Sequence, residues 1–200
     1  TQNDVVVLFA EGNSAAATTD YQSTTLLWNK DGVHLIGANA GPRFSHRSRI
    51  ALISSYVTAS NLITVSANGC LFANIEMLAG VADVNPTGCL KLTGMRNRFY
   101  NCHIAGIGND LMDTAGAYSL WFYGASENVF EKCVIGLDTI GRGSATNAEI
   151  LFTNSIYPAA TNFRNILDDC LIIGHCSSAA DYTFITANAT SSCLGRFLLL

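Results

Sequence analysis

Charged residues are scarce in this chain, and neither sign is in large excess. Lys, Arg, Asp and Glu make up 13% of the 200 residues, and the net charge is −4. The lack of a basic excess argues against nucleic-acid binding, because that affinity comes largely from neutralising phosphates. No apolar run reaches the roughly 20 residues that a membrane-spanning helix needs. The sequence therefore predicts neither a nucleic-acid nor a membrane partner.

Metal-binding and helical patterns are also missing. The seven cysteines show no paired spacing of the zinc-ribbon type, and their odd number fits synthesis in a reducing compartment. We therefore predict no metal site and no cofactor. No window shows the three-to-four residue apolar period of a helix, and Gly, Asn, Ser and Thr interrupt each longer stretch. These absences exclude helical solenoids.

A short template recurs instead, at intervals of about thirty residues. It reads Asn, any residue, a large apolar residue, two variable residues, Cys, any residue and Ile. A β-prone run closed by Gly or Asn precedes each copy, so each repeat is expected to hold two strands and a tight turn. The template occupies residues 97–104, 128–135 and 165–172, with weaker copies at 70–77 and 192–199; the preceding runs are 62–68, 89–94, 119–124, 149–154 and 182–188.

This repeat predicts an all-β fold, a right-handed single-stranded parallel β-helix of about seven coils forming one domain over residues 1–200. Stacked coils place equivalent positions above one another at about 4.8 Å. The template Asn would then form a ladder of side-chain amides, and the template Cys would pack inside the coil as a small apolar residue rather than in a disulfide. The residues concerned are Asn97, Asn128 and Asn165, and Cys102, Cys133 and Cys170.

The ends of the chain predict that it is a fragment of a longer polypeptide. The first residues contain neither Met nor a signal-peptide pattern, and residues 196–200 stop within an apolar strand. A solenoid needs polar caps at its ends, and the C-terminal residues provide none.

The segments between the repeated strands vary in length and composition. They are residues 79–88, 106–118, 136–147, 155–163 and 174–181. We expect them on one edge of the solenoid. Loops on a rigid scaffold are the commonest sites of partner contact.

The first coils carry a resemblance. An apolar strand closed by Gly12 and a polar loop are followed by Asp31-Gly-Val-His-Leu-Ile-Gly37. This order, together with the later Asn-x-Phe-x-x-Cys-x-Ile repeats, resembles bacteriophage virion proteins of the pectate-lyase-like β-helix superfamily. The resemblance implies a structural and adhesive virion protein, either a capsid-decorating protein, a fibre or a tailspike shaft. It also implies contacts with other virion subunits in a homotrimer.

The same superfamily contains polysaccharide lyases and hydrolases, which leaves an alternative open. A carbohydrate-active tailspike domain would hydrolyse or cleave a host surface polysaccharide, and a retaining hydrolase needs two carboxyl groups about 5–5.5 Å apart. Glu131 and Asp168 hold the same template position in successive repeats, so they should stack on one exposed face as acid and nucleophile. An ordinary solvated sheet face would show the same pair, and the sequence favours a non-enzymatic role.

Two groups are candidates for binding. Arg43, Arg47 and Arg49 form the one concentrated basic stretch, suited to an anionic sugar, a phosphate or an acidic subunit, or else a solvated loop. Trp121 and Tyr123 flank Phe122, so one of the two sets faces outward and could stack on a sugar or anchor an interface. The alternative for Trp121 is a place in the core.

Two weaker patterns complete the candidates. Loop aspartates at 110, 113 and 138 with Arg142 nearby would suit a calcium-dependent lyase, but an ordinary polar loop has the same composition. His34 and His103 alternate with apolar residues, so we expect both to be exposed strand residues rather than ligands.

Overall fold

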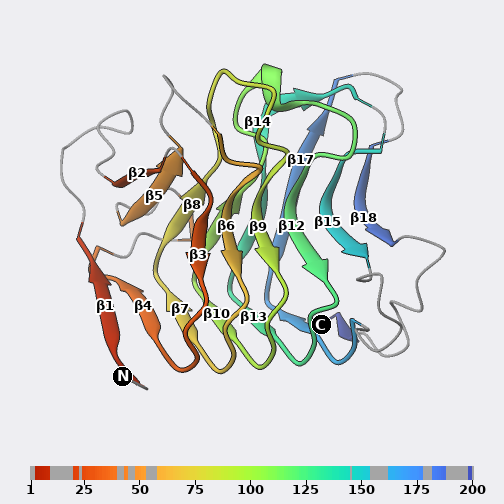
Figure 1. The fold of residues 1–200 in the computed structure, drawn as a ribbon. Coiled ribbons are helices and arrows are strands. Elements are labelled where there is room, and N and C mark those ends of the chain that lie inside the picture. The colour runs from red at the N-terminus through yellow and green to blue at the C-terminus, as the bar shows by residue number, and fades with distance from the viewer. Residues whose placement is uncertain are drawn as a thin grey trace.

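The computed structural model describes residues 3–9, 20–22, 24–39, 43–44, 48–52, 58–144, 146–153, 162–177, 182–187 and 198–199. Each coil passes through three parallel sheets in turn, and successive coils stack along one axis (Figure 1). This is the predicted right-handed parallel β-helix. The described residues contain no helix long and apolar enough to cross a membrane.

The three sheets are named here A, B and C in the order in which each coil visits them. Sheet A contains β1 (Val5–Leu8), β4 (His34–Gly37), β7 (Leu71–Ala73), β10 (Arg98–Tyr100), β13 (Val129–Glu131), β16 (Ile166–Asp168) and β19 (Leu198–Leu199). Sheet B contains β2 (Asp20–Gln22), β5 (Arg49–Leu52), β8 (Glu76–Leu78), β11 (His103–Ala105), β14 (Val134–Arg142) and β17 (Leu171–Cys176). Sheet C contains β3 (Leu26–Trp28), β6 (Asn61–Val65), β9 (Gly88–Leu92), β12 (Tyr118–Tyr123), β15 (Ala148–Thr153) and β18 (Thr183–Ala187). The 7 strands of sheet A agree with the expected number of coils.

Each coil has three strands, whereas the sequence predicted two. The template that was expected to form one strand is divided by a bend, as between β10 and β11, where Asn101 has a φ of 49°. The equivalent residues Asn74, Lys132 and Asp169 have φ values of 59°, 55° and 47°. One left-handed residue turns the chain from sheet A into sheet B. It also interrupts the alternation of side chains, which lets both Phe99 and Cys102 face the interior.

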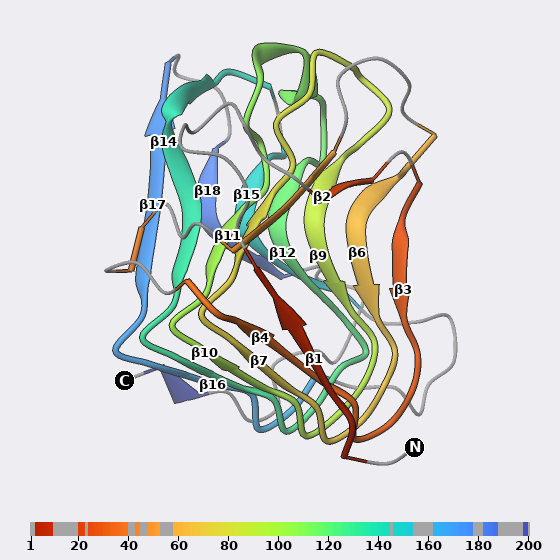
Figure 2. The same cartoon turned by 90° about the vertical axis from the view of Figure 1, so that its left-hand side faces the viewer.

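Aromatic rings stack inside the coils. Phe72, Phe99 and Phe130 lie in successive coils of sheet A with ring centroids 4.7 and 4.4 Å apart and nearly parallel planes. Phe122 and Phe152 stack in the same way in sheet C at 4.7 Å. Figure 2, which looks along the stack from its N-terminal end, shows the three sheets enclosing this interior. The core is therefore a set of columns that run along the axis.

The template cysteines are free thiols that face inward at the bend, as predicted. Each thiol lies 3.4–3.5 Å from two backbone carbonyl oxygens, one in its own coil and one in the coil before. Cys133, for example, donates to the carbonyls of Phe99 and Glu131. The thiol thus provides a weak donor for carbonyl groups at the point where the sheet changes direction.

The template asparagines form the predicted ladder at the corner between sheets C and A. Asn128 Oδ1 accepts from the Asn97 amide at 3.0 Å, and Asn165 Oδ1 accepts from the Asn128 amide at 3.0 Å. The Asn128 side-chain amide also donates to the carbonyls of Gly94 and Ser126. Each of these buried asparagines therefore bonds to backbone groups of the coil before, and Asn128 also bonds to a carbonyl of its own coil.

The variable loops do not all lie on one edge. Residues 79–87, 106–117 and 143–147 join sheet B to sheet C, as does the connection from β17 to β18; residues 145 and 178–181 of these segments lie outside the described residues. The segment 155–163 instead belongs to the connection from sheet C to sheet A, and its residues 155–161 lie outside the described residues. β14 also extends to Arg142, so much of the expected loop 136–147 is strand. The longer strand arises because it pairs with β17 on both sides of a bulge between Leu137 and Gly141.

We predict that Asn128→Ala destabilises the fold by about 3 kcal/mol, since it removes the partner of the buried Asn97 amide and of the Gly94 carbonyl. Urea denaturation followed by far-UV circular dichroism measures the change. Asn85→Ala, at an exposed position, is the control and should change the unfolding free energy by less than about 0.5 kcal/mol. Equal effects for the two variants would contradict the ladder.

Candidate functional site

Glu131 and Asp168 lie side by side on sheet A. They are register partners on the adjacent parallel strands β13 and β16, and Tyr100 is the next residue along the same row. Neighbouring strands are about 4.8 Å apart, close to the separation of a retaining pair. The expected stacking of these two residues one coil apart is thus present in the fold.

The surroundings of this pair are those of an open sheet face. The Glu131 carboxylate is ion-paired with the Arg98 guanidinium of the preceding coil, and its side chain is 23% exposed. Asp168 is exposed. Enzymes usually hold such groups in a concave, water-excluding site. The two carboxyl groups thus lie side by side, and in the described structure both side chains are open to solvent.

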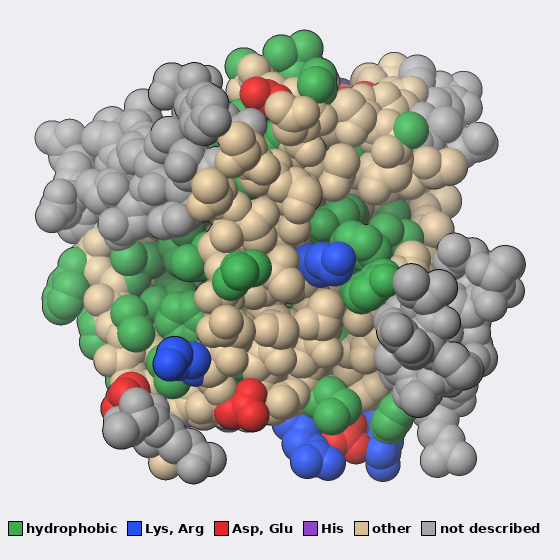
Figure 3. All heavy atoms as spheres, viewed as in Figure 1, with side chains coloured by type: hydrophobic (Ala, Val, Ile, Leu, Met, Phe, Trp, Pro, Cys, Tyr) green, Lys and Arg blue, Asp and Glu red, His purple; other side chains and the backbone are tan. Residues whose placement is uncertain are grey.

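Trp121 and Tyr123 face outward from sheet C, and Phe122 between them is fully buried. The Lys91 ammonium from the adjacent strand lies 4.2 Å from the Trp121 ring centroid and 4.4 Å from that of Tyr123. Partial burial lowers the Lys91 pKa, and the two rings stabilise its charge by cation–π contact. The Trp121 indole N–H donates to Thr153 at 2.7 Å. Figure 3 shows this face, with a basic side chain beside hydrophobic groups and few other charges near its centre.

The sequence analysis did not single out Lys91, although a signal for it was available. Aligning the β-prone runs that precede each template places Lys91 next to Trp121 in the row that continues to Leu151. A cation beside an aromatic residue in such a row is a cross-strand pair. The outward row of sheet C therefore places the Lys91 ammonium beside the Trp121 ring.

The two candidate arginines that the structure describes, Arg43 and Arg49, do not form one surface patch. Arg49 is 8% exposed and pairs with Glu76 at 2.8 Å on the outer side of sheet B. Arg43 is half-exposed and pairs with Asp169, which lies at a bend four coils further along the stack. Arg47 lies outside the described residues. Both described arginines, Arg43 and Arg49, thus form ion pairs with carboxylates of the same chain.

His103 is buried, contrary to expectation. It points away from the core, yet only 3% of it is exposed, because the Phe44 ring packs edge-on against it at 5.9 Å. Strand alternation predicted its direction correctly, but it could not predict a cover from a segment about sixty residues earlier. His34 is half-buried, and its Nδ1 accepts from the Leu71 amide at 3.0 Å.

Arg142 is fully buried and serves no exposed site. Its guanidinium donates to three backbone carbonyls and pairs with Glu149, which is also fully buried. Burial raises the pKa of the Glu149 carboxyl, while Arg142, Ser119 and Tyr182 act in the opposite direction by charge and hydrogen bonds. Gly136 and Gly174 leave room for this cluster, because a Cβ at either position would meet the Glu149 carboxyl group.

The loop aspartates are not brought together as a calcium site. Asp113 accepts hydrogen bonds from the Gly143 and Ser144 amides, Asp110 begins the short 3-10 helix η1 (Asp110–Met112), and Asp138 lies exposed on β14. Within the described ranges, no group of three or more His, Cys, Asp or Glu residues is arranged to hold a metal ion.

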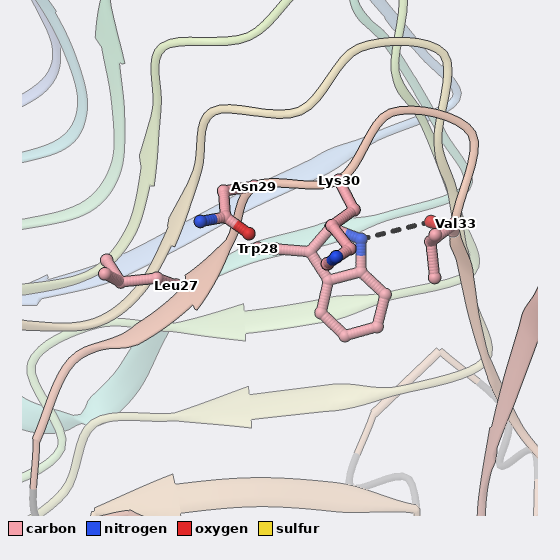
Figure 4. Close-up of a pocket in the computed structure, with 5 residues that line it drawn as sticks. All are labelled: Leu27, Trp28, Asn29, Lys30 and Val33. Carbon is pink, nitrogen blue, oxygen red and sulfur yellow. Dashed lines mark hydrogen bonds between the residues drawn. The ribbon is translucent and has the colours of Figure 1, made fainter. Parts of the chain in front are cut away.

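A shallow pocket of about 190 Å³ lies beside Trp28, near the N-terminal end of the stack. Leu27, Asn29, Lys30 and Val33 complete its lining, and the Trp28 indole N–H donates to the Val33 carbonyl (Figure 4). Trp28 also packs edge-on against Phe72, so it continues the internal aromatic column. None of the predicted catalytic or binding residues lines the pocket, and Val33 belongs to the stretch 31–37 that carries the resemblance.

Comparison with known proteins adds one similar structure. No family model and no curated protein sequence matches the chain. Its fold is similar to a crystal structure of a pectin methylesterase mutant in complex with a hexasaccharide, with a TM-score of 0.32, 9% identity, and coverage of 100% of this chain and 93% of the other. So low a score carries no argument about activity or ligand. The chain is a parallel β-helix protein by its own strand pairing.

We predict that Glu149→Gln destabilises the protein by about 3–5 kcal/mol, because it leaves the buried Arg142 charge without its counterion. In a separate double-mutant cycle, the variant Arg142→Met with Glu149→Leu should lose less than the sum of the single changes Arg142→Met and Glu149→Leu, by about 2 kcal/mol or more. Urea denaturation of the four proteins gives this coupling. Additive effects would show that the two side chains act independently.

Proposed function

We propose that this β-helix is a structural and adhesive protein of a bacteriophage virion: a capsid-decorating protein, a fibre or the shaft of a tailspike. The proposal rests on the resemblance carried by residues 31–37 and by the repeated Asn, Phe, Cys and Ile positions. Its partners would be other virion subunits, and the chain would act as a homotrimer, whose closed symmetry is common among oligomers.

The observation that best supports a structural role is that charged side chains join successive coils. Glu127 pairs with Arg96 of the coil before and with Arg164 of the coil after. Arg98 and Glu131 make a second such pair. Single surface ion pairs contribute at most about 1 kcal/mol, but a network holds its members in one geometry. These side chains stabilise the stack along its axis.

Locating the protein in its native particle tests the proposal. We expect antibodies against the folded chain to label purified virions at regular positions, seen by electron microscopy, with the number of copies in multiples of three. The control is the same serum after absorption with the purified chain. A virion role would be contradicted if the antibodies label host membranes or the medium but do not label the virions.

A second function is favoured by one observation, the alignment of Glu131 with Asp168 on adjacent strands. Under this alternative the chain is a carbohydrate-active tailspike domain that cleaves a host surface polysaccharide. Trp121 and Tyr123 would then bind the glycan on sheet C. Since Lys91 occupies the ring faces, a sugar would have to displace it or bind beside it.

We expect no polysaccharide degradation by the purified chain if the role is structural. If degradation is found, Glu131→Gln and Asp168→Asn should each lower its rate by at least about a hundredfold, the usual effect of removing a catalytic acid or base. Reducing-end release from host surface polysaccharide is the measurement. Asp138→Asn removes an equally exposed carboxylate and should leave the rate unchanged; a similar loss in this control would rule out a specific role for the pair.

A further inference from the structure

A buried charged cluster lies on the outer side of sheet B. Arg49, Glu76 and His103 are register partners on β5, β8 and β11, so their side chains form one row. The exposed fractions are 8%, 3% and 3%, although the row points away from the core. Phe44 covers His103. Ionisable groups enclosed in this way respond to a single added charge much more strongly than groups in water.

The two ring nitrogens of His103 both face oxygen atoms. Nε2 lies 3.0 Å from the Gly136 carbonyl oxygen, and Nδ1 lies 3.8 Å from Glu76 Oε1. A carbonyl oxygen can only accept, so Nε2 carries the hydrogen. A neutral imidazole has one N–H, and Nδ1 then presents a lone pair to a carboxylate. Nδ1 has no hydrogen-bond partner in the described structure.

Protonation would resolve this mismatch. An imidazolium has an N–H on each nitrogen, so it can serve Gly136 and Glu76 together after a side-chain movement of about 1 Å to reach hydrogen-bond distance. Since Glu76, His103 and Gly136 belong to β8, β11 and β14, the protonated ring would join three adjacent strands.

Among the described residues, the other charges near His103 occur in pairs. Glu76 is shared with Arg49 at 2.8 Å. Behind Gly136, the Glu149 carboxyl is paired with Arg142, and on the segment that carries Phe44, Arg43 is paired with Asp169. The Arg49 guanidinium disfavours a positive charge on the His103 ring, whereas the Glu76 carboxylate favours that charge. Glu76 lies on the strand next to His103, and Arg49 lies one strand further away. The carboxylate is the ionised group in line with Nδ1.

We propose that His103 is a proton-operated clamp that tightens sheet B in acid, by adding a Glu76 hydrogen bond that the neutral ring cannot make. The clamp closes when the ring takes up a second proton as the pH falls, and it opens when that proton is lost as the pH rises. Phe44 keeps water from competing for Nδ1. The consequence is a β-helix whose middle coils resist opening more strongly in acid than at neutral pH.

Nitrogen-15 NMR of the histidine-labelled protein tests the clamp directly. His103→Gln identifies the His103 signals among the four histidines. In the wild-type protein we expect a hydrogen on Nε2 alone at pH 8 and on both nitrogens at pH 5. A ring that keeps one hydrogen throughout this pH range would overturn the proposal. The spectra are those of the wild-type protein, and the variant serves only to assign the signals.

Stability measurements test the coupling to the sheet. The unfolding equilibrium constant of His103→Gln relative to wild type should increase by about tenfold or more between pH 8 and pH 5, as expected for a lost hydrogen bond to a charged group. His175→Gln, at an exposed position of β17, is the matched control and should show no such change. If His103→Gln does not fold, hydrogen exchange of wild-type β8 and β11, corrected for intrinsic rates, must show the same tenfold rise in protection in acid. A pH-independent ratio or protection would refute the clamp.

Discussion

Stacking of equivalent residues at about 4.8 Å is the constraint on which the rest of this structure depends. Every side chain has a neighbour from the coil before and another from the coil after, in register. Residues that interact well with copies of themselves therefore accumulate at repeated positions. Phe stacks on Phe in parallel planes, Asn bonds to the next Asn, and each Cys thiol contacts one carbonyl of its own coil and one of the coil before. The repeated template in the sequence reflects these columns, in which each residue type packs against copies of itself.

Charged residues cannot obey the same rule, because like charges opposite each other on adjacent strands are destabilising. The chain uses few of them, and their sign alternates in one column, although Glu131 and Asp168 are like charges on adjacent strands. The column of Arg96, Glu127 and Arg164 places a carboxylate between two guanidinium groups. All three residues have positive φ, so the residues that turn the backbone at this corner also form the column of ion pairs. Ion pairs with the adjacent coils are sufficient to explain an acidic residue in such a column, without a catalytic role.

The repeated part of the fold could be predicted from the sequence, and the part specific to one coil could not. Template spacing predicted the coils, the Asn97–Asn128–Asn165 ladder and the alignment of Glu131 with Asp168, because each repeat supplies independent support for the same feature. The bend at Asn101 was missed, since a left-handed Asn, Lys or Asp leaves no distinctive pattern of polarity. The burial of Arg142, Glu149 and His103 was missed for another reason. It depends on contacts between a single loop and a single strand, which periodicity does not contain.

The same distinction indicates where a β-helix of this kind can acquire a specific partner. The inward row of sheet C keeps one character through Ile63, Leu90, Leu120 and Ile150, all fully buried. The outward row changes at every coil, from Thr64 to Lys91, Trp121 and Leu151. An outward position accepts many residue types without disturbing the stack, so its side chain can vary to suit an external partner. A ladder position must keep its residue type, because that side chain bonds to the adjacent coils. Binding specificity in this fold therefore belongs to residues that break the repeat, and stability belongs to those that keep it.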